Sequence, residues 1–587
     1  MTEEKPSTPI PTLEDWQHWT WVMGRAQQML MENWAESAGK SGAPSAFGFG
    51  GPGGEAGPGA TPTDPMALMA AGAQAWAQGL EAWGRMIGID PAAKAEARDR
   101  RFAAPEWRDN PLFDTIRKTY LALADKMLGQ VEEVDGLDEA GRQKLRFATR
   151  NFVDAMSPSN FALTNPEVLK RTMETRGENL LKGLANMLDD VAAGQLTQTK
   201  AGAFEVGRNL AMTPGKVIHE TPLYQLIQYT PTTEKVLATP LVIFPPWINR
   251  FYILDLTPEK SFVKWCVDEG ISLFMVSWKS ADESIADVGL DDYVLKGQVD
   301  AIDTIRGVLD VPSVHTIGYC VAGTTLAATL AYLHAHKQQA KVKSATFFTA
   351  QVDFAEAGDL KLFLGDETMG LLSQMTADKG FLDGRYMAAT FNLLRGRDLI
   401  WSYVVNNYLL GQEPAPFDLL HWNSDTTNLP AAWHRNYLET LYKGNKLAEK
   451  GGISVAGTPI DLTTVKTPTY IQAGREDHIA PPQSVWKMMG HFIGDKRFVL
   501  AGSGHIAGVV NPPAAGKYQY WVNEAPCGTL DAFIAGASEH KGSWWPDWLA
   551  WLKRQDPKTV KAEGARVPGK GKLKAIEDAP GRYVRER

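Results

Sequence analysis

A cysteine, an aspartate and a histidine follow three separate apolar segments, in a setting that suits nucleophilic catalysis. Cys320 lies in HTIGYCVAGTT, where a strand pattern ends and a run of small residues begins a helix. A nucleophile in such a turn needs small neighbours, and Gly318 and Ala322 occupy the positions two before and two after it. A helix N-terminus favours the thiolate, and thiol attack on a thioester yields another thioester at little free-energy cost. The sequence therefore predicts an acyl-bearing Cys320, whereas an isolated cysteine is more often a buried core residue.

Two later segments supply an acid and a base. TYIQAGREDHIA gives a strand and then a turn holding Asp477, and KRFVLAGSGHIAG gives a strand and then the glycine-flanked His505. The order nucleophile, acid, histidine is that of an α/β-hydrolase triad. We therefore predict that His505 is the general base and Asp477 its partner or a second base. Glu476 could replace Asp477 but should point the other way, and His478, on the acid's own loop, suits a structural role.

The loop after the apolar segment 241–244 is a candidate oxyanion-binding element. Its sequence is PPWIN, and neither proline can donate a backbone N–H. The donor is then Trp247 or Ile248, of which we take Ile248, and the second donor is Val321, directly after the nucleophile. A simple strand-ending turn is the alternative.

Short apolar strands alternate with helical patterns from about residue 215 onward. This alternation predicts a mostly parallel sheet with helices on both faces, the α/β class, with an α/β-hydrolase fold. The stretch 351–440 is longer than a normal crossover and rich in aromatic residues, which predicts a cap over the site. The predicted strands are Leu241–Phe244, Leu273–Ser277, Val314–Tyr319, Ser344–Thr349, Thr469–Ala473 and Arg497–Leu500.

The part before the sheet is predicted to be helical and to contain a linker. Thirteen of the 25 residues in 38–62 are Gly or Pro, a composition that cannot bury enough apolar surface to fold. The predicted organisation is an amphipathic helix over 1–37, a flexible linker over 38–63, a helical domain over 64–210, and a catalytic domain over 211–587 that includes the cap at about 351–440 and a basic tail at 553–587.

Composition excludes several classes of protein. The chain has 587 residues, three cysteines and a net charge of −8, which disfavours a disulfide scaffold and general nucleic-acid binding. We also expect no secretory signal, no transmembrane segment and no metal-ligand cluster. The tail over 553–587 carries eleven Lys or Arg against five Asp or Glu. It is either a solvated tail or a contact for an anionic partner.

Several long strings resemble the class I polyhydroxyalkanoate synthases, over nearly all of residues 95–587. Ala322 departs from the G-x-C-x-G box usual in that family. The matching strings are GYCVAG (318–323), FPPWINRFYILDL (244–256), GREDHI (474–479), SGHIAGVVNPP (503–513), DRRFAAPEWRDNPLFD (99–114), LLRGRDLIWSYVVNNYLLG (393–411) and APGRYV (579–584).

The resemblance implies an enzyme that polymerises (R)-3-hydroxyacyl-CoA, chiefly the short-chain 3-hydroxybutyryl-CoA, into polyester with release of CoA. It implies that Cys320 carries the acyl group, that His505 deprotonates it, and that Asp477 helps to activate the 3-hydroxyl. It further implies a cytoplasmic homodimer on polyester granules, without a cofactor.

CoA brings phosphates, so an arginine near the cap is expected, and Arg395 is the candidate. A salt bridge with a nearby acid is the alternative role for this side chain. Asn249, Trp422 and Tyr437 are candidates for lining the acyl pocket or its entrance.

Two alternatives remain open at the level of sequence. One is a hydrolase on the same framework, either an intracellular polyester depolymerase or an acyl-CoA thioesterase, because water and hydroxyl acceptors need similar machinery. The other is a non-enzymatic granule-coat protein, which amphipathic Trp-containing helices would suit but which needs no triad.

Overall fold

The computed structural model describes residues 99–586, which belong to two compact units. The first unit ends at Lys200 and also takes in Phe391–Ala415; the second begins at Ala201 and holds the remaining described residues. The boundary expected at residue 210 is thus at 200, and 25 residues of the stretch expected as a cap belong to the first unit. The predicted helix 1–37, the linker 38–63 and the start of the helical region lie outside the described residues.

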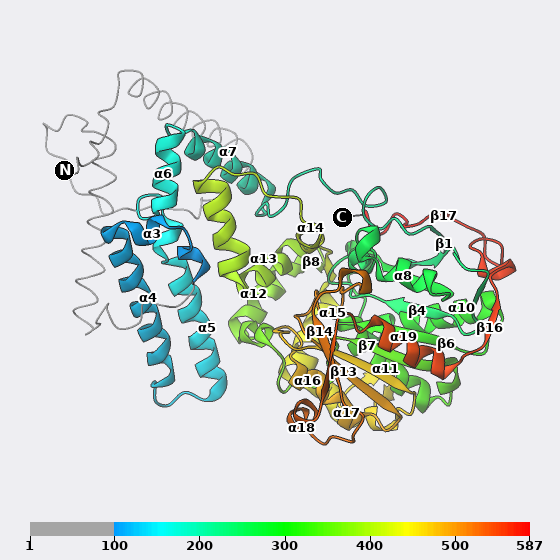
Figure 1. Ribbon diagram of the computed structural model, residues 1–587. Helices are drawn as coiled ribbons and strands as arrows, with labels where there is room; N and C mark the ends of the chain where they lie inside the picture. The colour runs from blue at the N-terminus through cyan, green and yellow to red at the C-terminus, as the bar shows by residue number, and fades with distance from the viewer. Residues whose placement is uncertain (1–98, 587) are drawn as a thin grey trace, which may run out of the picture. The chain divides into compact units, whose positions relative to one another are not determined.

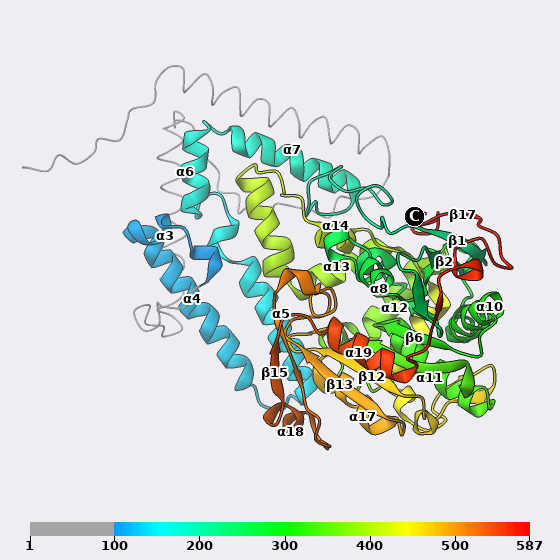
Figure 2. The same ribbon diagram turned by 45° about the vertical axis from the view of Figure 1, so that its right-hand side comes forward.

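Helices build the first unit, and its described residues contain no strand, as the pattern over 110–200 predicts. Helices α4 and α5 lie side by side as an antiparallel pair (Figure 2). Asn110 caps α4 by accepting the Leu112 N–H at 2.9 Å, and Pro111 occupies the first turn, where no N–H is needed. The helices are α3 (Glu106–Asp109), α4 (Pro111–Glu132), α5 (Glu139–Ala155), α6 (Pro166–Glu174), α7 (Glu178–Ala193), η9 (Arg397–Trp401) and η10 (Val404–Leu409).

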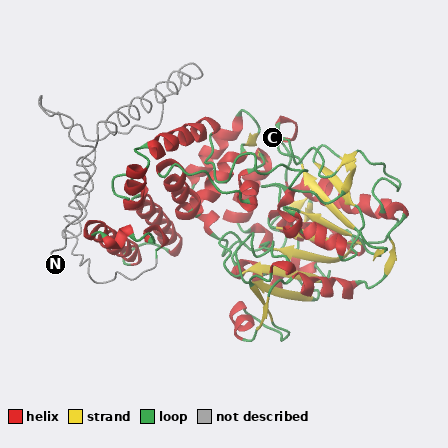
Figure 3. Ribbon diagram, turned by 45° about the horizontal axis from the view of Figure 1, so that its top comes forward, coloured by secondary structure: helices red, strands yellow, loops and turns green. Residues whose placement is uncertain are grey.

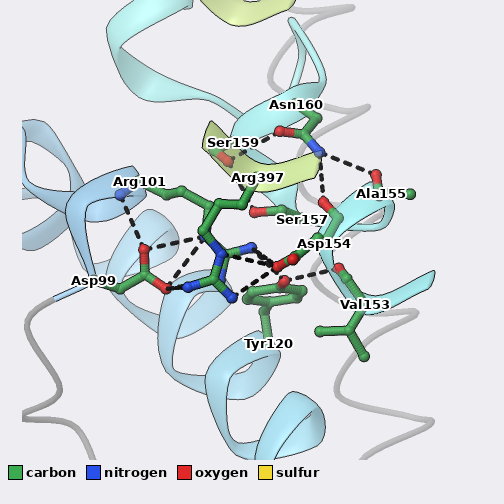
Figure 4. A network of polar contacts seen from close by, with 10 residues as sticks. All are labelled: Asp99, Arg101, Tyr120, Val153, Asp154, Ala155, Ser157, Ser159, Asn160 and Arg397. Atoms are coloured by element: carbon green, nitrogen blue, oxygen red, sulfur yellow. Dashed lines mark hydrogen bonds and ion pairs between the residues drawn. The ribbon is translucent and has the colours of Figure 1, made fainter. Parts of the chain in front are cut away.

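A buried network of charges joins four segments of the first unit (Figure 4). Asp154 accepts hydrogen bonds from Arg101 at 3.1 Å and from Arg397 at 2.8 Å. Arg101 also pairs with Asp99 at 2.7 Å and donates to the Tyr120 hydroxyl at 2.8 Å. Burial alone would raise the pKa of Asp99, but the neighbouring arginines lower it. The network therefore fixes η9 to the start of the described chain and to α4 and α5.

An eleven-stranded mixed sheet forms the centre of the second unit, with helices on both faces (Figures 1 and 3). Its order is β15-β14-β13-β12-β7-β6-β4-β5-β2-β1-β17, and the strands from β13 to β5 in this order are parallel. The sheet strands are β1 (Gly215–Glu220), β2 (Tyr224–Tyr229), β4 (Leu241–Phe244), β5 (Leu273–Trp278), β6 (Val314–Tyr319), β7 (Val342–Phe348), β12 (Thr469–Gly474), β13 (Lys496–Ala501), β14 (Gln519–Val522), β15 (Ser538–Lys541) and β17 (Glu577–Asp578).

All six strands predicted from the sequence are present, and they are the six parallel strands of this sheet. The antiparallel strands at both edges extend it beyond the prediction. Short pairs stand apart from the sheet: β3 (Lys235–Leu237) with β16 (Thr559–Lys561), β8 (Phe381–Leu382) with β9 (Leu429–Pro430), and β10 (Ser454–Val455) with β11 (Thr458–Pro459).

Two layers of helices cover the sheet. Side chains alternate between the faces of a strand, so that Gly318 of β6 faces α11 while Ile317 and Tyr319 face the other layer. The helices of this unit are α8 (Phe262–Asp268), α9 (Leu290–Asp292), α10 (Asp300–Leu309), α11 (Val321–Ala335), α12 (Asp366–Ala377), α13 (Gly384–Leu394, which crosses into the first unit), α14 (Asp418–Ser424), α15 (Ala431–Asn436), η11 (Tyr437–Lys443), α16 (Pro482–Trp486), α17 (Met488–His491), α18 (Leu530–Ala535) and α19 (Trp545–Gln555).

Helix α19 carries much of the tryptophan of the second unit into the core. Trp545, Trp548 and Leu552 recur at helical spacing and are buried against the sheet. The Trp545 and Trp548 rings contact Phe262 of α8 at centroid distances of 4.9 and 5.2 Å. Large aromatic rings bury the most apolar area per residue, so this cluster anchors the face of the sheet opposite α11.

The basic tail is folded onto the second unit, which argues against a freely solvated tail, one of the two alternatives that the sequence leaves open. Strand β16 pairs with β3, and β17 pairs with β1 at the edge of the sheet. Arg566 is buried and donates to the Ser272 hydroxyl at 3.0 Å and to the Ala238 carbonyl at 2.7 Å. Tyr583 is also buried, with its hydroxyl on the Thr221 carbonyl at 2.8 Å. These partners lie more than 290 residues earlier in the chain, where local sequence patterns do not reveal them.

Candidate active site

Cys320 lies in a strained turn at the carboxyl end of β6, the position predicted for a nucleophile. Its φ of 53° and ψ of −125° lie in a region that non-glycine residues rarely occupy. The Cys320 N–H donates to the Phe348 carbonyl at 2.9 Å, and the Cys320 carbonyl accepts the N–H groups of Gly323 and Thr324. These bonds fix the cysteine between β6 and the first turn of α11.

The departure at Ala322 is accommodated within the elbow. Ala322 is fully buried, and its carbonyl accepts a hydrogen bond from Gln298 at 2.9 Å. The close approach that requires glycine lies instead between Gly318 and Gly323. A Cβ on Gly318 would come within 2.5 Å of the Gly323 Cα, and one on Gly323 within 2.4 Å of the Ala350 Cβ.

We expect Gly318→Ala to open the elbow, because the added methyl group meets backbone that cannot move away. Overpacking of this kind lowers the free energy of unfolding by about 1–3 kcal/mol, and we expect catalytic activity to fall by at least about 100-fold, since small displacements of a nucleophile are costly. Calorimetry and steady-state kinetics measure the two effects. Gly307→Ala on α10 is the matched control, because a Cβ there meets nothing within 4 Å. Equal activities of the two variants would contradict the expectation.

The acid and the histidine meet at the carboxyl ends of β12 and β13. The His505 Nδ1 donates to the Asp477 Oδ2 at 2.7 Å, and the Asp477 Oδ1 accepts the N–H groups of Ile479 and Ala480 at 2.8 and 2.9 Å. The Tyr319 hydroxyl donates to the His505 carbonyl at 3.2 Å. The carboxylate is therefore held by three donors, and the histidine is held from both its ring and its backbone.

The charges of the site favour a protonated His505. Burial lowers the pKa of this imidazole, but Asp477 and Cys320 outweigh burial and raise the pKa well above 6.5. The imidazole can thus accept the thiol proton and then remain as a cation between the two anions. The arrangement is suited to covalent acyl transfer through sulfur.

The two rival residues on the acid loop are arranged differently. Glu476 is exposed, whereas Asp477 is buried. The His478 carbonyl accepts the Asp359 N–H at 3.0 Å, and a Cβ on Gly358 would come within 1.9 Å of it. The backbone of His478 therefore serves as a packing contact for the segment after β7.

The loop after β4 is held from several sides. The Pro245 carbonyl accepts the Trp278 indole N–H at 2.7 Å, and the Trp247 carbonyl accepts the Thr427 hydroxyl at 2.5 Å. The Trp247 ring stacks on Tyr293 at a centroid distance of 3.8 Å. The neighbouring Ile248 is buried. Val321 is the first residue of α11, where backbone N–H groups have no partner within the helix.

The four candidate substrate contacts are placed in three different settings. Tyr437 is buried on η11. Burial is the main cause that raises the pKa of Tyr437, and the charges of Tyr442 and then Cys320 raise this pKa further. Asn249 is buried and bridges to Thr426 through its backbone. Trp422 lies in the main core cluster, with its indole N–H on the Arg250 carbonyl at 2.7 Å.

The fourth candidate, Arg395, belongs to the first unit, while the triad belongs to the second. It pairs with Asp398 at 2.8 Å, and its side chain is 55% exposed. This is the salt bridge that the sequence offers as the alternative role.

Sequence patterns did not reveal Gln351 and Tyr442. Gln351 is 4% exposed, and its amide hydrogen-bonds to the Tyr442 hydroxyl at 3.3 Å. Tyr442 follows Tyr437 by five residues, a spacing that places both on one side of a π-helix but not of an α-helix. Two tyrosines five residues apart in an aromatic segment are the sequence signal that could have identified Tyr442.

Within residues 99–586, no three His, Cys, Asp or Glu side chains are grouped so that they could hold a metal ion. No helix in that same range combines the length and apolar character that crossing a membrane requires.

Comparison with known proteins finds matches along most of the chain. Residues 98–266 match the family described as poly-beta-hydroxybutyrate polymerase (PhaC) N-terminus, and residues 263–512 match the alpha/beta hydrolase fold. The chain is 47% identical over 518 residues to a poly(3-hydroxyalkanoate) polymerase subunit PhaC of Rhizobium meliloti, covering 87% of this chain and 83% of the relative. It is 42% identical over 509 residues to the subunit of that name from Cupriavidus necator, covering 86% of each.

Proposed function

The chain belongs to the poly(3-hydroxyalkanoate) polymerase family, and from this premise we propose how its residues join hydroxyacyl groups from CoA into polyester. It is an acyltransferase with an α/β-hydrolase fold, as the sequence resemblance implies. The proposal concerns the residues that carry the acyl group and the substrate that the chain prefers. One observation supports it above the others: a cysteine in the strained elbow, whose charge helps to raise the pKa of the histidine in a hydrogen-bonded His505–Asp477 pair.

The first half-reaction loads the enzyme. His505 takes the Cys320 proton, and the sulfur attacks the thioester carbon of hydroxyacyl-CoA. The bond from that carbon to the CoA sulfur breaks, and the CoA thiolate leaves with the proton from His505. The N–H groups of Val321 and Ile248 stabilise the oxyanion that forms during this exchange.

The second half-reaction extends the polyester. The 3-hydroxyl oxygen of a further acyl unit attacks the thioester carbon on Cys320 while its proton passes to the His505–Asp477 pair. A new ester bond forms, the bond to the Cys320 sulfur breaks, and the thiol recovers a proton. Sulfur suits this role because a thioester keeps the acyl group activated, whereas a serine ester would hold it in a more stable form. We propose that no cofactor takes part, because the CoA thioester supplies the activation.

We propose (R)-3-hydroxybutyryl-CoA as the preferred substrate, because aromatic side chains crowd the region of Tyr437 near the nucleophile. The test measures CoA release from this thioester together with the mass of insoluble product. Release of CoA with an equivalent mass of polyester is expected. Release of CoA with only free 3-hydroxybutyrate would indicate the thioesterase or depolymerase reaction and would contradict the proposal.

We further propose that the chain works in the cytoplasm as a homodimer at the surface of polyester granules. Exposed apolar side chains on the first unit support a contact with an apolar surface. They include Leu145 and Phe152, seven residues apart on one face of α5, and Met156, the residue that directly follows this helix. The segments before residue 99 that the sequence predicts to be helical and associates with granules lie outside the described residues.

A further inference from the structure

Gln351 lies beside the nucleophile elbow, three residues after Phe348, the last residue of β7. The Phe348 carbonyl at the end of β7 accepts the Cys320 N–H. The Gln351 carbonyl accepts the Thr324 hydroxyl at 2.7 Å, and Thr324 lies one helical turn after Cys320 on α11. The segment 348–351 is therefore fixed to the elbow at two points, Cys320 and Thr324.

The side-chain amide of Gln351 joins two further elements. Its Oε1 accepts the Ser484 hydroxyl of α16 at 2.8 Å, and its Nε2 donates to the Tyr442 hydroxyl of η11 at 3.3 Å. Ser484 also reaches the Asp353 carbonyl at 2.5 Å. An amide offers an acceptor and a donor at the same carbon, so glutamine can serve both neighbours at once. Helix α16 follows the loop that carries Asp477, which connects this contact to the acid of the triad.

The Tyr442 hydroxyl is part of a buried tyrosine pair near Cys320. The Tyr437 and Tyr442 rings lie 5.3 Å apart between centroids, in an edge-to-face contact. Phe354, three residues after Gln351, contacts both rings at 6.2 and 4.8 Å. Burial raises the pKa of both tyrosines, and the nearby Cys320 raises it further.

We propose that Gln351 is a positioning residue of the polymerase, which holds the tyrosine pair of η11 in register with the nucleophile elbow and the acid-loop helix. The proposal rests on Cys320 as the acyl carrier. Removal of the amide leaves the buried hydroxyls of Ser484 and Tyr442 without this partner and allows η11 to shift relative to Cys320. Chemistry on the thioester then slows, while the binding of the CoA thioester stays the same.

The test compares Gln351→Leu, Tyr442→Phe and the double variant by steady-state kinetics with (R)-3-hydroxybutyryl-CoA. For Gln351→Leu we expect kcat to fall by about 10-fold to 100-fold, as for a small misplacement of reacting groups, with KM within about twofold. The double variant should be no slower than the slower single variant, because both changes break one contact. Gln338→Leu, at an exposed glutamine three residues after α11, is the control and should keep wild-type kinetics.

Three outcomes would overturn the proposal: an unchanged kcat in Gln351→Leu, a fall that appears in KM instead, or losses in the two single variants that multiply in the double variant. Thermal melts of each variant accompany the kinetics, and Tyr442→Phe serves as the independent reading should Gln351→Leu not fold. Failure of the acyl-carrier assignment is separately visible, because it would appear as polymer formation by a variant without the Cys320 thiol, whatever Gln351→Leu does.

Discussion

Cys320→Ala is expected to abolish both CoA release and polymer formation, with kcat falling by at least about 1,000-fold. Without the sulfur, the acyl group has no carrier between CoA and the growing chain, and the His505–Asp477 pair has no thiol to activate. Mass spectrometry of the wild-type protein after a short exposure to substrate should show an acyl adduct on the peptide that contains Cys320, and the variant should show none.

Cys527→Ala is the matched control for this experiment. Cys527 lies outside the elbow, where its thiol contacts the Asn523 amide and the Ala525 carbonyl. We expect its removal to leave kcat within about twofold, since single surface changes away from a site have small effects. Polymer formation by Cys320→Ala at a rate near that of this control would refute the covalent mechanism.

His505→Gln is expected to lower kcat by about 100-fold to 10,000-fold, the range that general base catalysis contributes. Because the thiolate raises the pKa of His505, the imidazolium stabilises the thiolate by the same free energy. Alkylation of Cys320 by iodoacetamide at pH 7 should therefore slow by about 10-fold or more in this variant, by the same coupling. His540→Gln, at an exposed position on β15, serves as the control.

The interaction between His505 and Asp477 also makes the free energy of unfolding depend on pH, in a direction that can be predicted. The pKa of His505 in the folded state is raised above its ordinary value of 6.5. Its contribution to stability is thus complete below about pH 6.5 and is lost as the pH rises through the raised pKa. Asp477→Asn removes the main charge that raises this pKa, so the difference in unfolding free energy between the variant and wild type should shrink as the pH rises. A difference independent of pH from 5 to 9 would contradict the assignment.

The central strands could be predicted from sequence because burial on both faces gives each an apolar run. β4 and β6 begin and end where the pattern predicts. The edge strands could not, since they are short and largely polar: β15 has the sequence SEHK and is exposed along its whole length. Only pairing with β14, supplied by the rest of the fold, makes it a strand.

The residues of the candidate site also fall into those that the sequence predicts and those that depend on the rest of the fold. Cys320, Asp477 and His505 follow central strands, so their sequence positions alone place them at one edge of the sheet. Trp422 and Gln351 depend on tertiary partners far away in the chain. The Trp422 indole reaches the Arg250 carbonyl, 172 residues before it, and the Gln351 amide reaches Ser484, 133 residues after it. Nothing in the local pattern distinguishes such side chains from any other tryptophan or glutamine.

The folded tail also bears on the order in which this protein is assembled during synthesis. Arg250, beside the loop after β4, donates to the Tyr583 carbonyl at 3.1 Å and to the Glu586 carbonyl at 2.6 Å. The ribosome adds more than 300 residues between the arginine and these acceptors. A nascent chain therefore carries its nucleophile, acid and histidine before the neighbouring loop acquires these final supports. The final contacts of that loop therefore form only after nearly the whole catalytic unit has left the ribosome.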